Sequence, residues 1–241
     1  MRGTKPDVCV VIPTLNESDT IGELIEGLGE LDEIYIRTIV IDDGSTDGTQ
    51  EIVGAASWWD DDVHLVKRGR KLGLGTAIRE GVMRSLELEP PPDYIVTMDG
   101  DLSHDPKAIP LMVKSCGGES LIIGSRYVEG GEIRGWHASR HVISRAANLI
   151  GRVLGKIPAK DVTSGFRCYG VGLERAIVPE LEASGYGIQI EMLSVAARRG
   201  FQIDEVPIVF TDRENGDSKL DVTQILKYVT TAFRLFIHSY R

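Results

Sequence analysis

The chain has 241 residues, of which 42% are hydrophobic, enough to bury the core of one large α/β domain or two small ones. A net charge of −9 argues against nucleic-acid binding, which needs a basic surface to displace counterions. Cys9, Cys116 and Cys168 are too scattered for a disulfide framework or a zinc-knuckle spacing. No apolar run approaches the roughly 18 residues of a membrane span, so we expect a protein that is soluble or bound only at a membrane surface.

Short apolar runs alternate with segments of helical periodicity along the first half of the chain. In chain order we expect strand 8–12, helix 16–28, strand 35–42, a further helix, strand 63–67, helix 73–88, strand 95–98 and strand 120–125. The helix after the second strand is expected to be capped by Ser45, Thr46 or Asp47. This order, with nearly continuous apolar strands, predicts an α/β fold of Rossmann-like type: a mainly parallel central sheet with helices on both faces.

Acidic residues follow three of these strands. Glu17 comes after the first strand, Asp42 and Asp43 after the second, and Asp99 and Asp101 after the fourth. Ligands of open parallel sheets bind beyond the carboxyl ends of the strands, where these carboxylates would repel one another unless a cation compensated them. Mg²⁺ or Mn²⁺ fits, because such ions take oxygen ligands and complete their shell with water and substrate phosphates. We therefore predict that the last pair holds a metal that carries a phosphate.

Ordinary turn chemistry is the alternative for these residues, since Asp and Gly are common in turns. One of Asp42 and Asp43 is expected to be a structural residue such as a helix N-cap. Gly100 is expected to let the backbone approach a ligand closely. We interpret His104 as a solvated loop residue. The segment GLGTAIREG at residues 73–81 lacks the third glycine of a dinucleotide-binding fingerprint, so we exclude that function.

Nine segments stand out as a set along the chain: VVIPTLNES, VIDDGSTDGT, GLGTAIREG, MDGDLSHDP, IGSRYVEGG, SRHVISRAAN, DVTSGFRCY, IQIEM and EVPIVFTDRENGDSK. In this order and spacing, over nearly the whole chain, they resemble the family 2 glycosyltransferases, and among them the dolichyl-phosphate mannose synthases. The resemblance implies a GT-A type nucleotide-diphospho-sugar transferase domain at residues 1–220. It also implies transfer of a sugar to a polyprenyl phosphate. A C-terminal amphipathic helix is expected at residues 221–241.

The resemblance also implies three groups of site residues. The first should contact the nucleoside of the donor: Pro13, Leu15, Glu17, Ile41 and Asp43. The second should hold the donor diphosphate, with Gly100 alongside the metal ligands Asp99, Asp101 and Ser103. The third should supply cations for the donor or acceptor phosphates: Arg126, Arg140, Arg213 and Lys219. We expect Asp101, Arg126, Arg140 and Lys219 to be catalytic. The family usually has an aromatic residue where Leu15 stands and often has Gln where Ser103 stands.

A phosphate acceptor needs no general base. Its oxygen is already anionic near neutral pH, because its second pKa is about 6, whereas a sugar hydroxyl must lose a proton. The enzyme must instead bring two anions together, which requires a metal and basic side chains. Direct in-line attack at the anomeric carbon would invert its configuration.

The resemblance therefore implies transfer of mannose from GDP-mannose to dolichyl or another polyprenyl phosphate, which would give dolichyl phosphate β-D-mannose. One alternative is a polyprenyl-phosphate glucose synthase that uses UDP-glucose. Another is a soluble transferase to a hydroxyl acceptor, for which Glu191 is the candidate base. A third is a non-catalytic subunit that binds nucleotide sugars, against which the set of Asp99, Asp101, Arg140 and Lys219 argues.

A lipid acceptor would bring the chain to a membrane. From Asp221 onward, apolar residues recur at i, i+3, i+4 and i+7 intervals with basic residues nearby, which is typical of an amphipathic helix in the headgroup region. A helix that packs on the core is the alternative. The helix expected at residues 137–154, with Trp136 at its start, is a second candidate for the membrane interface. We expect peripheral attachment to the cytoplasmic face of a membrane, directly or through a separate small membrane subunit.

Overall fold

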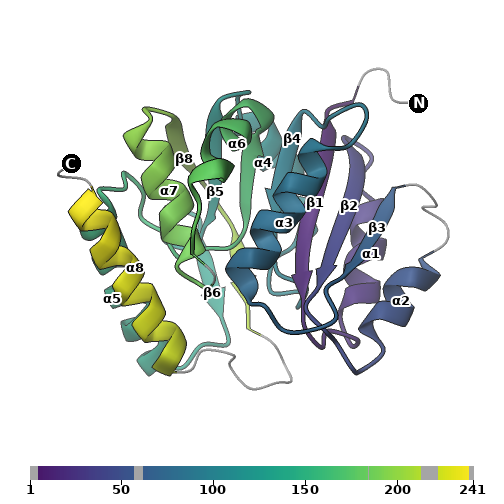
Figure 1. The fold of residues 1–241 in the computed structure, drawn as a ribbon, viewed down its shortest axis with the longest axis horizontal. Helices are drawn as coiled ribbons and strands as arrows, with labels where there is room; N and C mark the ends of the chain where they lie inside the picture. The colour runs from purple at the N-terminus through teal and green to yellow at the C-terminus, as the bar shows by residue number, and fades with distance from the viewer. Residues whose placement is uncertain (1–4, 57–61, 184, 213–221, 239–241) are drawn as a thin grey trace.

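The computed structural model describes residues 5–56, 62–183, 185–212 and 222–238. Seven strands form one open sheet in the order β3-β2-β1-β4-β7-β5-β8 (Figure 1). They are β1 (Asp7–Thr14), β2 (Tyr35–Asp42), β3 (Val63–Lys67), β4 (Tyr94–Thr97), β5 (Ser120–Ser125), β7 (Arg167–Gly170) and β8 (Gln202–Pro207). All neighbouring pairs are parallel except those of β7, which is antiparallel to both β4 and β5. The predicted mainly parallel sheet is confirmed.

Helices cover both faces of this sheet, as predicted (Figure 1). One face is covered by α1 (Ile21–Gly29), α2 (Thr49–Ala55) and α4 (Ile109–Ser115), and the other by α3 (Leu74–Leu86), α6 (Val171–Ile177) and α7 (Ile188–Arg198). At one end of the molecule, α5 (Ala138–Gly155) and α8 (Val222–His238) pack against each other and against α7. A small parallel sheet joins β6 (Glu132–Arg134) to β9 (Val209–Thr211), and 3₁₀ turns occur at η2 (Pro106–Ala108) and η3 (Val178–Glu180).

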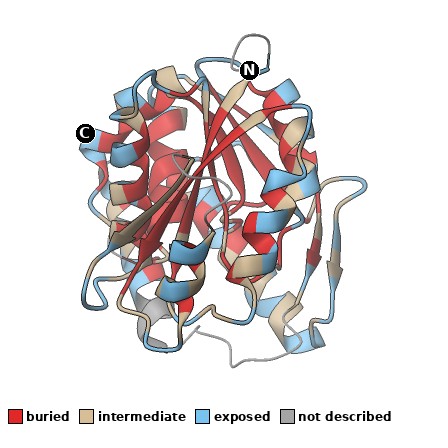
Figure 2. Ribbon diagram, turned by 90° about the vertical axis from the view of Figure 1, so that its right-hand side faces the viewer, coloured by how far each residue is buried: buried red, intermediate tan, exposed pale blue. Residues whose placement is uncertain are grey.

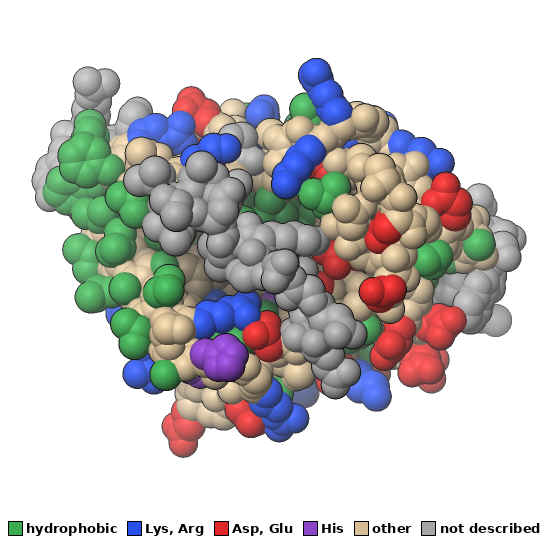
Figure 3. All heavy atoms as spheres, turned by 90° about the horizontal axis from the view of Figure 1, so that it is seen from below, with side chains coloured by type: hydrophobic (Ala, Val, Ile, Leu, Met, Phe, Trp, Pro, Cys, Tyr) green, Lys and Arg blue, Asp and Glu red, His purple; other side chains and the backbone are tan. Residues whose placement is uncertain are grey.

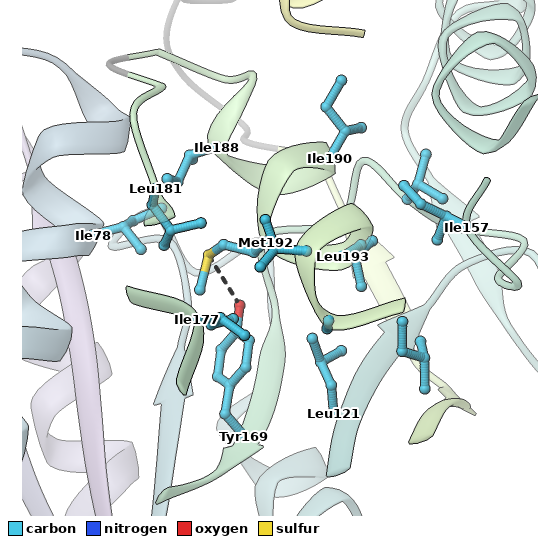
Figure 4. Close-up of a cluster of buried hydrophobic side chains, with 14 of the residues drawn as sticks. Ile78, Leu121, Ile157, Tyr169, Ile177, Leu181, Ile188, Ile190, Met192 and Leu193 are labelled. Atoms are coloured by element: carbon cyan, nitrogen blue, oxygen red, sulfur yellow. Dashed lines mark hydrogen bonds between the residues drawn. The ribbon is translucent and has the colours of Figure 1, made fainter. Parts of the chain in front are cut away.

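The core has two layers because successive side chains of a strand point to opposite faces of the sheet. In β1, Val10 and Ile12 pack with α1, α2 and α4, whereas Val11 between them packs with α3, α6 and α7. Figure 2 shows the buried strands between these two helical layers. Figure 4 shows part of the second layer, in which the Tyr169 hydroxyl donates to Sδ of Met192 at 3.6 Å. Burial on both faces explains why these strands contain so few polar residues.

The expected strands at 35–42, 63–67 and 120–125 have the predicted bounds, but two helix starts differ. α1 begins at Ile21, because Asn16 has a left-handed φ of +56° and its side chain accepts the N–H of Thr46. α2 begins at Thr49 with Gly48 as N-cap, so the expected N-cap at residues 45–47 is wrong. The φ of +99° at Gly48 favours glycine there, and Asp47 still accepts the N–H of Thr49 at 3.1 Å.

Glu174 is a buried acid on α6, one of the helices of the second layer. It is fully buried, and neither of its carboxylate oxygens has a hydrogen-bond partner among the described residues. Burial raises the pKa of Glu174 from an ordinary value of 4.5 to about 8, although the charge of Arg167 opposes the rise. The folded state therefore binds this proton more tightly than the unfolded chain does.

We predict that Glu174→Gln flattens the pH dependence of stability. The stabilising effect of this proton is fully present below the unfolded pKa, near 4.5, and is lost as pH rises to about 8. Between about pH 5 and pH 8, the free energy of unfolding of the wild-type protein should fall by on the order of 2–4 kcal/mol relative to the variant. Urea unfolding across this range measures the difference. The exposed Glu119→Gln is the matched control, and parallel profiles for wild type and Glu174→Gln would refute the prediction.

Candidate functional site

A pocket opens at the carboxyl ends of β1, β2 and β4, the edge at which open α/β sheets bind ligands. Figure 3 views the molecule from this edge. Six of the predicted site residues line the pocket: Pro13, Leu15, Glu17, Asp43, Asp99 and Gly100. The structure thus brings together the predicted nucleoside-binding segment after β1 and the acidic turn after β4.

The two acids after β2 differ in their surroundings. Asp42 is fully buried, and its carboxylate accepts hydrogen bonds from Ser45, Gln50 and Thr14. Burial alone would raise the pKa of Asp42, but these hydrogen bonds outweigh it and lower the pKa. Asp42 is therefore the structural member of the pair, although it closes a turn and does not cap a helix.

Asp43 is the member of the pair that lines the pocket. Its carboxylate accepts the N–H groups of Leu72 and Gly73 at 2.9 and 2.8 Å, and Arg68 pairs with it at 2.9 Å. These bonds tie the end of β2 to the loop before α3. The carboxylate is thus held in a fixed orientation at the pocket wall.

Asp99 and Asp101 follow β4, and Gly100 between them lies against the end of β1. A Cβ built at Gly100 would lie 3.2 Å from Cγ2 of Thr14, so a larger residue would crowd this contact. Asp101 is nearly buried, and its Oδ1 accepts the backbone N–H of Ser103 at 3.1 Å and its hydroxyl at 2.6 Å. Ser103 therefore orients the Asp101 carboxylate. The role of Ser103 as a metal ligand stays a prediction.

The acidic turn suits a hard cation by its chemistry, since carboxylates are the ligands that Mg²⁺ and Mn²⁺ prefer. Within the described part of the chain, no group of three or more His, Cys, Asp or Glu residues is arranged to hold a metal. An ion held by Asp99 and Asp101 would leave coordination positions for water and a phosphate, which is usual for Mg²⁺.

Arg126 forms a buried ion pair with Asp161. Nε and Nη2 of Arg126 both donate to the carboxylate at 2.7 Å, and the backbone N–H of Arg126 adds a third bond at 3.0 Å. Burial alone would lower the pKa of Arg126 and raise that of Asp161, but their mutual attraction outweighs it, so the Arg126 pKa is raised and the Asp161 pKa is lowered. The charge of Asp99 also contributes to the raised pKa of Arg126.

An aromatic cluster surrounds this ion pair and extends to the second predicted arginine. The guanidinium groups of Arg126 and Arg140 both lie over the Trp136 ring, with their Cζ atoms 5.4 and 4.4 Å from its centroid. Phe210 adds a further ring 5.4 Å from Cζ of Arg126. Asp212, just after β9, holds Arg140, with Nη1 to carboxylate distances of 2.6 and 2.7 Å. The two arginines thus share one aromatic platform, and each has its own carboxylate.

His104 belongs to the same cluster, and the interpretation of it as a solvated loop residue is wrong. It is only 2% exposed, stacks on Phe166 with ring centroids 5.0 Å apart, and makes a T-shaped contact with Phe210. Burial lowers its pKa to about 4, so the ring is neutral at pH 7. The apolar rings contributed by β9 and by the segment before β7 account for its burial, and they could not be assigned from the local sequence.

Of the other predicted residues, Asp101, Ser103, Arg126 and Arg140 are not among those that line the pocket, and neither is Ile41. Ile41 is fully buried and packs with Cys9, Ile39 and Ala77, because its side chain points from β2 into the core. Arg213 and Lys219 lie outside the described residues.

The pocket also contains residues that were not predicted from the sequence. They include Lys71, Leu72 and Gly73 before α3, Gly185 and Tyr186 before α7, and Lys227 of α8. The segment GLGTAIREG, one of the nine segments that resemble the family, is the local signal for the loop before α3, although it lacks the third glycine of a dinucleotide fingerprint. No local pattern marked Tyr186 or Lys227, which the fold brings to the pocket from distant parts of the chain.

Comparison with solved structures defines the class of fold. The chain superimposes with a TM-score of 0.68 on glucosyl-3-phosphoglycerate synthase from Mycobacterium tuberculosis, solved in complex with Mn²⁺, uridine diphosphate and phosphoglyceric acid. The match covers 97% of this chain and 79% of that chain at 22% identity. The protein therefore has the GT-A type fold that was predicted.

The chain belongs to glycosyltransferase family 2, whose family model, described as "Glycosyl transferase family 2", matches residues 9–177. It is 38% identical over 218 residues to a protein of Micrococcus luteus named undecaprenyl-phosphate mannosyltransferase, a match that covers 88% of this chain and 87% of that protein. It is 37% identical over 219 residues to the polyprenol monophosphomannose synthase of Mycolicibacterium smegmatis, covering 90% of this chain and 82% of that protein. The protein is therefore a glycosyltransferase, and the predicted family is confirmed.

We predict that Asp161→Asn destabilises the fold by about 3–5 kcal/mol, because it leaves the Arg126 guanidinium buried without a counter-charge. Urea unfolding measures the loss. Glu132→Gln is the matched control: it breaks the Arg134–Glu132 pair, which is exposed, so its free energy of unfolding should hardly change. Equal effects of the two substitutions would contradict the assignment of Arg126 and Asp161 as a buried, mutually dependent pair.

Proposed function

We propose that this protein transfers mannose from GDP-mannose to the phosphate of a polyprenyl lipid such as dolichyl phosphate. The observation that carries the proposal is the likeness, over most of both chains, to proteins named undecaprenyl-phosphate mannosyltransferase and polyprenol monophosphomannose synthase. The pocket at the carboxyl edge of the sheet supports a nucleotide-sugar donor, and the two arginines that contact the Trp136 ring support an anionic acceptor.

The nucleoside of the donor is proposed to lie against Pro13 and Leu15. Both side chains line the pocket and offer an apolar surface to the ring of the base. Glu17 and Asp43, on the same wall, can accept hydrogen bonds from the base or from ribose hydroxyls. Since Asp43 is already oriented by Arg68 and two backbone N–H groups, little side-chain entropy would be lost when it binds.

The diphosphate of the donor is proposed to lie at Asp99 and Asp101, where these carboxylates would hold Mg²⁺ or Mn²⁺. A bound ion would neutralise charge on the leaving diphosphate. Arg126 is committed to Asp161, so its proposed contribution is a fixed positive charge beside Asp99. Ser103 would keep the Asp101 carboxylate in position through its two hydrogen bonds.

The acceptor phosphate is proposed to attack the anomeric carbon directly and with inversion. Its oxygen is anionic near neutral pH, so no side chain has to remove a proton. Arg140 is the described cation that we assign to this phosphate, because a third of its side chain is exposed while the stack on Trp136 and the pair with Asp212 fix its orientation. Arg213 and Lys219 stay as proposed phosphate contacts outside the described residues.

A transfer assay tests this function. Purified protein with Mn²⁺ and a polyprenyl phosphate should move label from GDP-mannose, and not from UDP-glucose, into the organic phase. Asp101→Asn should reduce this transfer by about 100-fold or more, because one of the two carboxylates proposed to hold the charge-compensating ion would be lost. Label from UDP-glucose alone would assign a glucose synthase. Donor binding without transfer of either sugar would assign a non-catalytic subunit.

An apolar surface on the same molecule suits a lipid acceptor. The α5/α8 face consists of exposed side chains on two adjacent helices: Val142, Ile143, Leu149, Ile150, Val153, Val229, Phe233 and Ile237. In Figure 3 apolar side chains gather at the end of the molecule that these helices form. Exposed Arg145 and Arg152 on α5 lie close by in the sequence and would favour anionic headgroups. No helix in the described ranges is long and apolar enough to span a bilayer. We propose that this face rests on the cytoplasmic leaflet.

We predict that Ile143→Asp combined with Phe233→Asp weakens binding to anionic phospholipid vesicles by about tenfold or more, because two apolar groups would no longer leave water. Co-sedimentation with vesicles measures this, and affinity for GDP should stay unchanged. Leu111→Asp, an exposed apolar residue of α4 on another part of the surface, is the matched control and should bind vesicles as the wild type does. Unchanged sedimentation of the double variant would refute the membrane role of the face. If the wild-type protein binds vesicles only together with a co-expressed membrane subunit, the α5/α8 face would be the contact surface for that subunit.

A further inference from the structure

α8 reaches the wall of the pocket as well as the α5/α8 face. Lys227, near its start, lines the pocket together with Gly185 and Tyr186 and with Asp99 of the acidic turn. Its side chain is exposed and forms no ion pair with any carboxylate in the described part of the chain. An ammonium group in this position is available to a ligand.

Lys227 is the first member of a stripe that faces α7. Residues spaced i, i+4 and i+7 share one side of a helix, and here they are Lys227, Thr231 and Arg234. Thr231 packs closely on Gly187: a Cβ added to Gly187 would lie 2.5 Å from Oγ1 of Thr231. Arg234 pairs with Glu191 of α7, and with Glu182 at 2.5 Å. The stripe therefore follows the segment before α7 down to the pocket.

Glu191 ties this segment and α8 together. It is only 3% exposed, and its Oε2 accepts the backbone N–H groups of Glu182 and Ala183 at 2.9 and 2.8 Å, while its Oε1 pairs with Arg234. Two residues further along the chain, the segment reaches Gly185 and Tyr186 at the pocket. Glu191 is thus engaged as an anchor, which argues against the alternative in which it is a catalytic base.

The charge at the pocket indicates what Lys227 would bind. Glu17, Asp43 and Asp99 line the pocket, and of the described residues only two lysines, Lys71 and Lys227, bring positive charge to its wall. Asp43 is compensated by Arg68, so neither lysine is needed for that carboxylate. An exposed ammonium beside the turn proposed to carry a diphosphate is suited to a phosphate oxyanion.

We propose that Lys227 is a phosphate-binding residue of the active site, and that α8 is therefore part of the catalytic machinery as well as a membrane contact. The inference rests on the proposed function in so far as the phosphate is that of the nucleotide donor or of the lipid acceptor. The ligand chemistry, a phosphate oxyanion, is the same in both cases. Binding measurements with each source distinguish them.

Equilibrium binding tests the proposal without requiring turnover. GDP with Mn²⁺ is the donor probe, and farnesyl phosphate, a short acceptor that needs no bilayer, is the acceptor probe. Lys227→Gln should weaken the binding of one of them by on the order of tenfold, and Lys227→Arg should restore most of the affinity, because it keeps the charge. Lys114→Gln, an exposed lysine of α4, is the matched control and should change neither.

A second variant separates a site role from a general loss of structure. Arg234→Gln keeps the Lys227 side chain but removes the ion pair that holds α8 against Glu191, so it should weaken binding of the same probe. The double variant with Lys227→Gln should lose less affinity than the product of the two single effects. A weaker GDP complex assigns the donor diphosphate, and a weaker farnesyl phosphate complex assigns the acceptor. The proposal fails if Lys227→Gln changes neither constant more than Lys114→Gln does. A wild type that binds GDP but transfers no mannose would refute the proposed function and leave this test intact.

Discussion

Compensation of negative charge at the carboxyl edge of the sheet determines how the rest of the site is arranged. Several acids gather there, and crowded carboxylates stay ionised only where hydrogen-bond donors or cations compensate their charge. The turn after β2 donates hydrogen bonds to Asp42. Asp43 is paired with Arg68 and accepts two backbone N–H groups, and Asp161 is paired with Arg126. The loops that supply these partners are thereby fixed, and the pocket is bounded by them.

Much of the fold could be predicted from the sequence, because the strands are buried on both faces and read as short apolar runs with clear ends. The acidic turn after β4 could also be predicted, since its residues are adjacent in the chain. β7 could not, because RCYG carries an arginine whose charge gives no sign of a central strand, yet Arg167 is fully buried and donates to the carbonyls of Gln189 and Val162. The position of this side chain depends on partners that only the assembled fold provides.

The parts of the site that escaped prediction share one physical origin. His104 is buried by Phe166 and Phe210, Arg126 is neutralised by Asp161, and Lys227 is carried to the pocket by a helix near the end of the chain. Each of these facts depends on a contact between segments far apart in sequence. Local patterns identify which residues can do chemistry, but they do not show which distant residue pairs with a given side chain in the folded protein.

The antiparallel direction of β7 has a consequence for where the chain can vary. Its first residue, Arg167, pairs with Thr97 and Ile123, so β7 starts at the edge where β4 and β5 finish. The segment that leads into it, which carries Asp161, must therefore cross the ligand side of the sheet. A lengthened connection there would intrude on the pocket, whereas the turn at 117–119 lies on the opposite edge, where its backbone packs against Gly170 and accepts the N–H of Gly172.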